Sequence, residues 1–363
     1  MKSNRHILVA MSGGVDSSVA LYLLKQSGYS VSGVTMKLWD YGTVGGGETA
    51  RSAGGCCNLQ AVNNARAVCD LLGVSHYTVD FSEEFRRTVI DDFVGEYRRG
   101  RTPNPCIRCN TIIKWERLLR LAQKIGCYGL ATGHYARTGF DSESGRYFIR
   151  RGVDSSRDQA YALWGLSQEA LSRTVLPLGD LAKTDTRRIA RQAGLKTADT
   201  AESREICFVT DDDYERFLRE WVGDDIPEGE IVDTAGRRLG RHRGIPFYTV
   251  GQRKGLGIAH PTPLYVISID AAANRLTVGN REELRRRGLT VSGVQWVSSP
   301  PVTEPFKALT QIRYQHRAAA SAVTPLPDGR LSVLFDDSQA AITPGQSAVI
   351  FDGDLVMAGG VID

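Results

Sequence analysis

Three cysteines in polar surroundings are the residues of this chain best suited to covalent chemistry. Cys106 and Cys109 lie in RTPNPCIRCN, and Cys207 lies in SREICF. A cysteine reacts as its thiolate, which a nearby arginine or a helix N-terminus stabilises, and Arg108 and Arg204 are close in sequence. The chain has seven cysteines at irregular spacing and no secretion signal, which argues against a disulfide framework. The sequence therefore predicts reactive or metal-binding thiols.

A second set of residues with chemical potential lies in MSGGVDSS near the N-terminus. A glycine-rich turn between a strand and a helix directs backbone N–H groups and the positive helix end at an anion, so it is suited to phosphate. Gly13 and Gly14 permit close approach, the serines offer hydroxyl donors, and Asp16 is suited to orient Mg²⁺. No lysine follows the glycines, so this is not a Walker A loop. SGGVDSS resembles the pyrophosphate loop of the N-type ATP pyrophosphatases, which include amide synthetases and tRNA-modifying enzymes.

The surrounding pattern predicts a parallel sheet that positions this loop. Apolar runs of strand type at 6–11, 31–39, 76–81 and 128–135 alternate with helical segments, among them 59–73 and 115–126. Alternation of strand and helix is typical of a doubly wound α/β domain. We expect an adenylation domain of this PP-loop type over residues 1–207.

The second half of the chain has a different texture. After a short helix at 211–222, short strands alternate with turn signals, including Asp352-Gly353 between two apolar runs. This pattern predicts a small β-rich central domain over 208–282 and a C-terminal β-barrel over 288–363. No run of about 18 apolar residues occurs, and the first apolar run is too short for a signal peptide, so we expect a cytoplasmic protein without a membrane partner.

Basic residues are concentrated in two stretches, although the net charge is only +4. The stretch 98–120 has seven Lys or Arg residues against Glu116, and 237–254 has six and no acid. One such run is as readily a solvated surface as a binding site, but two of them favour a polyanionic partner.

The motifs taken together resemble one family over nearly the whole chain. The motifs are GRTPNP, a CN after three further residues, ATGHY, DQAYALW, ICF, GQRKGLGI and TPGQSAV. In this order they are similar to those of the bacterial tRNA-specific 2-thiouridylases. The resemblance implies ATP-dependent replacement of O2 of the wobble uridine by sulfur in tRNAs for Lys, Glu and Gln. It also implies Mg²⁺, an adenylated uridine, a cysteine persulfide, and a cysteine desulfurase or sulfur-carrier protein as partner.

The resemblance also assigns roles to individual residues. Cys109 and Cys207 take the catalytic positions, with the persulfide on Cys207. ATP contacts fall on Ala10, Met11, Ser12, Gly13, Gly14, Val15, Asp16, Ser17, Met36 and Gly133. Asn104, Pro105 and Cys106 lie beside the target base, and tRNA contacts fall on His134, Arg157, Asp158, Gln159, Arg313, Tyr314 and Gln346.

One position departs from the family pattern. Cys106 stands where the two-cysteine enzymes have Asp, and with Cys109 it forms a C-x-x-C. Cys106, Cys109 and Cys207 thereby resemble the three-cysteine [4Fe–4S] arrangement of other tRNA thiolases. Two further hypotheses remain open from the sequence: an amide-forming ATP pyrophosphatase, and a non-catalytic, redox-sensing RNA-binding protein.

Overall fold

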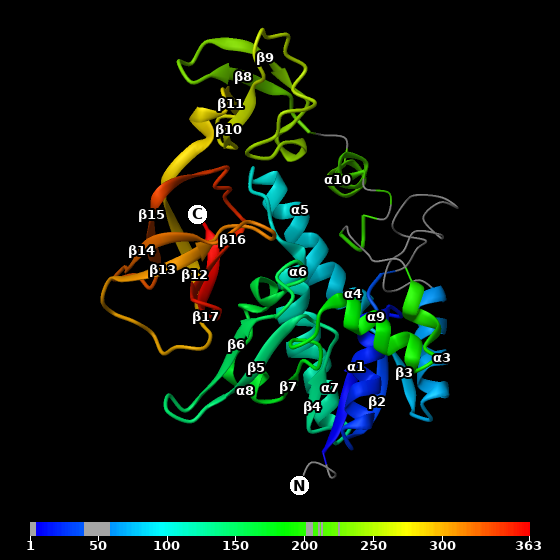
Figure 1. Cartoon of the computed structure of the whole chain (residues 1–363). Helices are drawn as coiled ribbons and strands as arrows, with labels where there is room; N and C mark the ends of the chain where they lie inside the picture. Colours follow the sequence, from blue (N-terminus) through cyan, green and yellow to red (C-terminus); the bar gives the residue numbers. More distant parts are fainter. Residues whose placement is uncertain (1–4, 40–58, 201–205, 210, 212, 224–225) are drawn as a thin grey trace.

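A five-stranded parallel sheet forms the centre of the first part of the chain (Figure 1). The computed structural model describes residues 5–39, 59–200, 206–209, 211, 213–223 and 226–363. The strand order is β3-β2-β1-β4-β7, and every pairing is parallel. These strands are β1 (His6–Ala10), β2 (Ser30–Lys37), β3 (His76–Asp80), β4 (Gly129–Ala131) and β7 (Thr174–Val175). The doubly wound α/β prediction is confirmed, whereas β7 has no counterpart among the predicted strands.

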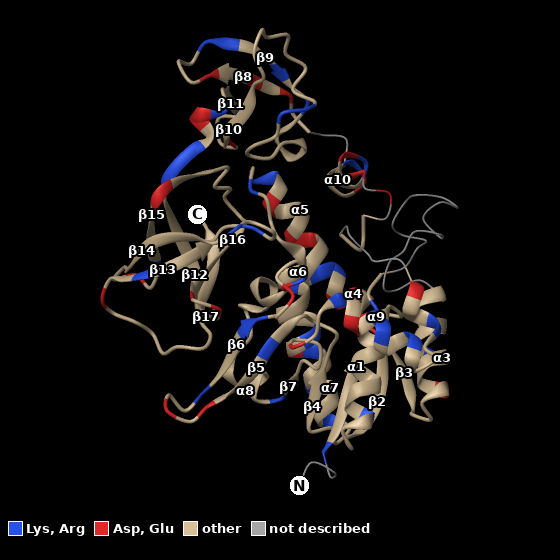
Figure 2. Ribbon diagram, viewed as in Figure 1, with Lys and Arg blue, Asp and Glu red and all other residues tan. Residues whose placement is uncertain are grey.

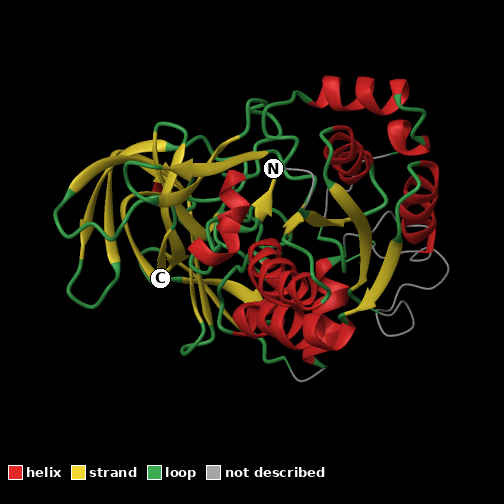
Figure 3. Cartoon of the chain, turned by 90° about the horizontal axis from the view of Figure 1, so that it is seen from below, coloured by secondary structure: helices red, strands yellow, loops and turns green. Residues whose placement is uncertain are grey.

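Helices cover both faces of this sheet (Figure 3). Alternate residues of β1 point to opposite faces, as a strand requires: Ile7 and Val9 belong to one hydrophobic cluster, and Leu8 and Ala10 to the other. The first cluster includes α1 (Val15–Gln26), α3 (Leu59–Leu71) and α9 (Lys183–Gln192). The second includes α4 (Ser82–Phe85), η1 (Arg86–Ile90), α5 (Asp91–Arg98), η3 (Ala160–Leu163), α8 (Gln168–Ser172) and α10 (Tyr214–Val222). The 3-10 segment η4 (Lys196–Asp199) follows α9.

One continuous helix carries the two neighbouring cysteines. It consists of α6 (Pro105–Arg108), the π-helical segment η2 (Cys109–Leu118) and α7 (Leu119–Lys124). Asn104 accepts a hydrogen bond from the Cys106 N–H and is followed by proline, a combination that favours helix initiation. The helix therefore begins about ten residues before the predicted start at 115.

The central part forms a four-stranded sheet in the order β10-β11-β8-β9. Its strands are β8 (Gly229–Asp233), β9 (Arg238–His242), β10 (Tyr265–Asp270) and β11 (Arg275–Gly279), with short 3-10 segments η5 (Ile245–Phe247) and η6 (Glu282–Leu284). Ile231, Val266, Leu276 and Val278 fill its small core.

The C-terminal part is a closed six-stranded barrel, as predicted. Pairing between β12 and β17 closes the sheet that runs β12-β15-β14-β13-β16-β17. Its strands are β12 (Arg285–Trp296), β13 (Phe306–Gln311), β14 (Ala319–Pro325), β15 (Leu331–Ala340), β16 (Ser347–Asp352) and β17 (Leu355–Ile362). In the described residues, no helix is long and apolar enough to span a membrane.

A hairpin from the first part extends the sheet of this barrel. Strands β5 (Ala136–Asp141) and β6 (Arg146–Arg151) pair with each other, and β6 pairs with β17. Asp354 strengthens this junction through ion pairs of 2.6 Å with both Arg137 and Arg150. The sequence analysis placed no strands here, and the boundaries 1–207, 208–282 and 288–363 stay predictions.

Candidate active site

The glycine-rich loop connects β1 to α1 at the carboxyl edge of the parallel sheet, where ligands of open α/β sheets bind. Gly14 is the N-cap of α1 and makes no side-chain cap hydrogen bond, so the cap residue offers no side-chain acceptor to the N–H groups of the first turn. Ser17 Oγ accepts from the Ser12 N–H at 3.1 Å and lies 3.2 Å from Ser12 Oγ. Ser18 Oγ donates to the Gly14 carbonyl at 2.9 Å. The loop is thus folded by its own serines into a turn that leaves the start of α1 suited to an anion.

Helix α3 packs directly under the loop. Gly13 has a φ of +74°, and a Cβ there would lie 2.3 Å from the Ala61 carbonyl oxygen. Asn64 Nδ2 lies 3.5 Å from the Gly13 carbonyl as a donor. A carboxylate at position 64 could not donate this contact when ionised. The loop therefore requires glycine at position 13 for two independent reasons.

Asp16 pairs with Lys183, a residue that the sequence analysis did not single out. Lys183 Nζ lies 2.7 Å from both carboxylate oxygens of Asp16, and the Tyr135 hydroxyl donates to Asp16 Oδ1 at 2.8 Å. The side chain of Lys183 is only 11% exposed, whereas that of Asp16 is 33% exposed. Burial and the Asp16 charge raise the pKa of Tyr135 far above its usual range, so this hydroxyl stays protonated and donates. The phosphate loop thus carries a nearby cation of its own.

The other predicted ATP contacts lie at the same sheet edge. Met36 is next to the last residue of β2, and Gly133 follows β4 by two residues. A Cβ on Gly133 would lie 2.7 Å from the backbone carbon of Asp16, so this loop touches the start of α1. Parallel topology therefore brings the predicted nucleotide contacts from β1, β2 and β4 together, and their contact with ATP stays a prediction.

The predicted catalytic cysteines contact one hydrophobic cluster. Cys109 is buried at the first position of η2, and Cys207 is half-buried and packs against the cluster to which Cys109 belongs. Phe208, the next residue, is fully buried with ring centroids 5.3 Å from Phe93 and 5.7 Å from Phe85. This aromatic anchor fixes the chain beside Cys207.

The cysteines do not form a metal site in this arrangement. Cys106 is exposed, Cys109 is buried and Cys207 is intermediate. Among the residues that the structure describes, no three His, Cys, Asp or Glu side chains are grouped as metal ligands. The three thiols therefore do not fit a [4Fe–4S] cluster in this structure.

Several residues predicted to contact tRNA also have structural roles. Asp158 has a side chain only 6% exposed, which pairs with Arg151 at 2.7 Å and accepts from the Gly152 N–H at 3.0 Å. Gln159 accepts from the Tyr135 N–H at 3.0 Å. His134 is buried, and its Nδ1 lies 2.6 Å from Thr132 Oγ1. Desolvation lowers the pKa of His134 well below its usual value, so the ring is neutral at pH 7.

Tyr314, one of the predicted tRNA contacts, lies in the loop between β13 and β14. The side chain is 44% exposed. Burial raises the pKa of Tyr314, the charges of Asp158 and Cys106 act in the same direction, and Arg157 opposes them. Arg313, its neighbour, is exposed and donates to the Ala340 carbonyl at 3.2 Å. The barrel therefore presents an exposed aromatic side chain in the loop between β13 and β14.

The two basic stretches are less positive in the folded chain than in the sequence. Arg238 pairs with Glu230, Arg241 with Glu228, and Arg243 with Glu215, all acids from outside the stretch 237–254. Arg99 and Arg101 both pair with Glu96, and Arg108 pairs with Asp92. These ion pairs are partly exposed and contribute little to stability, so an RNA phosphate can replace the carboxylate as partner of the arginine. The ribbon shows Lys and Arg positions on β9, which belongs to the stretch 237–254, and at the start of β12, which lies outside both stretches (Figure 2).

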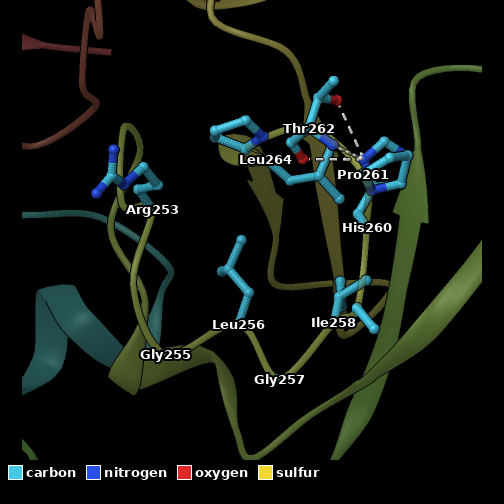
Figure 4. A pocket seen from close by; sticks show the side chains of 11 residues that line it. Arg253, Gly255, Leu256, Gly257, Ile258, His260, Pro261, Thr262 and Leu264 are labelled. Atoms are coloured by element: carbon cyan, nitrogen blue, oxygen red, sulfur yellow. Dashed lines mark hydrogen bonds between the residues drawn. The ribbon is translucent and has the colours of Figure 1, made fainter.

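The GQRKGLGI motif forms a cavity of about 630 Å³ in the central part (Figure 4). Arg253 lies on one side, Leu256 at the base, and His260 and Thr262 on the other side. His260 Nδ1 lies 3.2 Å from Thr262 Oγ1. The cavity thus has cationic and hydroxyl groups around an apolar floor.

Comparison with known proteins identifies the family. The chain is 47% identical over 363 residues to a protein of Caldanaerobacter subterraneus subsp. tengcongensis named tRNA-specific 2-thiouridylase MnmA 2, covering 100% of this chain and 99% of that protein. A tRNA-specific 2-thiouridylase MnmA of Geobacter metallireducens is 48% identical over 362 residues, covering 100% and 98%. This chain belongs to the tRNA-specific 2-thiouridylases.

Family models match each part of the chain. The model described as tRNA methyl transferase HUP domain matches residues 5–211, that of the PRC-barrel domain matches 215–280, and that of an aminomethyltransferase beta-barrel domain matches 286–362. The family therefore extends over the phosphate loop, the cysteine segments, the central cavity and the barrel.

Proposed function

We propose that this chain is an ATP-dependent tRNA sulfurtransferase that replaces O2 of the wobble uridine by sulfur. The observation that carries the proposal is the similarity over the whole chain to relatives named 2-thiouridylases. The tRNAs for Lys, Glu and Gln are the proposed substrates.

The first step is adenylation of the uridine. Uridine O2 attacks the α-phosphate of ATP, and the bond between this phosphorus and the oxygen that bridges to the β-phosphate breaks. Pyrophosphate leaves, and the glycine-rich loop stabilises its negative charge. The N–H groups at the start of α1 and the Ser12 and Ser17 hydroxyls are positioned for the pyrophosphate. Mg²⁺, when bound with ATP, would neutralise phosphate charge, and Asp16 offers a carboxylate in the first turn of α1.

The second step transfers sulfur. The terminal sulfur of a Cys207 persulfide attacks C2, and AMP leaves with O2. The Cys109 thiolate then attacks Cys207 Sγ, so the S–S bond breaks, 2-thiouridine is released and a Cys109–Cys207 disulfide forms. In the alternative order, Cys109 first releases hydrosulfide, which attacks C2. A dithiol reductant must regenerate the thiols, and a cysteine desulfurase or sulfur carrier supplies the persulfide sulfur.

The proposed RNA surface runs from the helix start at Asn104 to Tyr314 and on to the central cavity around Arg253. Reaching C2 requires the base to leave its stack, and an exposed aromatic such as Tyr314 can stack on a displaced base. Arg157 is suited to the adjacent phosphates because guanidinium binds them in bidentate geometry.

Nucleoside mass spectrometry tests the proposal directly. Unmodified tRNA incubated with the protein, Mg-ATP and a sulfide source should gain 2-thiouridine and release AMP and pyrophosphate in equal amounts. The proposal is wrong if AMP forms only with ammonia or glutamine, or if no nucleotide is hydrolysed with any tRNA.

A further inference from the structure

The segment just before the base-site helix is held by the C-terminal barrel. The Thr102 N–H donates to the Pro344 carbonyl at 2.8 Å. In return, Gln346 Nε2 donates to the Thr102 carbonyl at 2.9 Å and lies 3.4 Å from the Pro103 carbonyl. Two segments more than two hundred residues apart thus exchange hydrogen bonds directly beside Asn104.

Further contacts reinforce the same segment. Arg101 donates to the Ile362 carbonyl at 3.2 Å, while its Nε pairs with Glu96 at 2.7 Å. The Thr102 hydroxyl donates to Thr249 Oγ1, in the central part, at 3.2 Å. Residues of all three parts of the chain therefore fix the path of residues 101–103.

The barrel loop is shaped for this close approach. Gly345 has a φ of +90°, and a Cβ there would lie 2.9 Å from the Thr102 nitrogen. The backbone of Gln346 makes two hydrogen bonds: its N–H donates to the Thr343 carbonyl, and its carbonyl accepts from the Ile362 N–H. Its half-buried side chain therefore extends from a rigid base toward the Thr102 carbonyl.

The side-chain amide of Gln346 donates to the protein backbone. The carboxamide nitrogen Nε2 is the side chain's donor atom, and it lies 2.9 Å and 3.4 Å from the backbone carbonyl oxygens of residues 102 and 103. The resemblance assigns Gln346 to tRNA, whereas in this structure its amide nitrogen is hydrogen-bonded to the protein backbone. The carbonyls that it holds immediately precede Asn104, whose side chain caps the helix of Cys106 and Cys109.

We propose that Gln346 is a positioning residue, which acts through residues 102–104 to fix the base-site helix, and that its amide does not supply tRNA affinity. The inference rests on the proposed sulfur transfer. A displacement of reacting groups by about 1 Å can cost about a hundredfold in rate, so loss of this tether should be visible in kcat.

Steady-state kinetics of 2-thiouridine formation by the full-length Gln346→Glu variant tests this role. The carboxylate cannot donate and faces two carbonyl oxygens, so kcat at saturating tRNA and ATP should fall at least about tenfold. The KM for tRNA should change less than about twofold, because the tether adds no RNA contact. Iodoacetamide should label Cys106 faster, because its helix start is less restrained.

Matched variants separate the alternatives. Gln192→Glu, at the exposed end of α9, makes the same charge change and should leave kcat unchanged. Arg313→Gln, a predicted RNA contact, should raise KM instead. If Gln346→Glu does not fold, Gln346→Met removes the same hydrogen bonds without adding a charge and replaces it in the kinetic test.

A raised KM with kcat retained, or no change in either constant, overturns the positioning role. If the wild-type protein forms no 2-thiouridine, the proposed function fails, and Cys106 labelling alone decides the tether: a rate equal to that of wild type refutes it.

Discussion

Replacing Gly13 by alanine should disable the phosphate loop, and Gly28 offers a control with the same backbone problem. Both glycines have left-handed φ angles, +74° and +82°. Each alanine should therefore cost about 1–2 kcal/mol of stability. At Gly13 the new Cβ would also lie 2.3 Å from the Ala61 carbonyl oxygen, whereas at Gly28 nothing lies within 4 Å.

The clash at Gly13 requires the loop or α3 to move by roughly 1 Å to reach ordinary contact distance. A shift of this size should lower the rate of AMP formation by about a hundredfold. Calorimetric ATP titration and AMP release, with thermal unfolding of both variants, measure the two effects separately. Gly28→Ala should lose stability but keep ATP binding. If Gly13→Ala binds ATP and forms AMP as Gly28→Ala does, the loop does not hold the phosphates as argued.

Two further predictions concern side chains of the site. Lys183→Met should lower the rate of AMP formation at least about tenfold and lower the free energy of unfolding in urea by about 1–3 kcal/mol, less than for a fully buried pair because Asp16 is a third exposed. Adding Asp16→Asn should restore the stability but not the activity. An unchanged rate and stability of Lys183→Met would contradict the pairing. Cys207→Ser and Cys109→Ser should each abolish 2-thiouridine formation while ATP binding persists. The control Cys69→Ser should stay active, since burial raises the pKa of Cys69 to about 12 and keeps its thiol neutral. Formation of 2-thiouridine by Cys207→Ser or Cys109→Ser would exclude the two-cysteine mechanism.

Features that depend on neighbouring residues could be predicted from the sequence. The loop at Gly13 and Gly14 needs only a strand, two glycines and a following helix, so its local pattern was sufficient. The alternating apolar runs likewise indicated the parallel sheet and the barrel.

Features that depend on distant residues could not be predicted in this way. Lys183 reaches Asp16 from 167 residues away, and no spacing rule connects the two. Glu215 and Glu228 neutralise arginines of a stretch that contains no acid of its own. The hairpin β5–β6 finds its partner only in β17, so its strands carry no local sign of membership in the barrel sheet.

This hairpin has a consequence for synthesis of the protein. Strand β6 ends at Arg151, and its partner strand β17, which begins at Leu355, is synthesised about two hundred residues later. At roughly 5–20 residues per second, the ribosome needs about 10–40 seconds to deliver it. The carbonyl of Ile362, which accepts a hydrogen bond from Arg101, likewise lies 261 residues further along the chain. A chain that terminates before β17 would therefore carry the glycine-rich loop and both predicted catalytic cysteines, but it would lack the β6–β17 pairing and the hydrogen bond from Arg101 to Ile362.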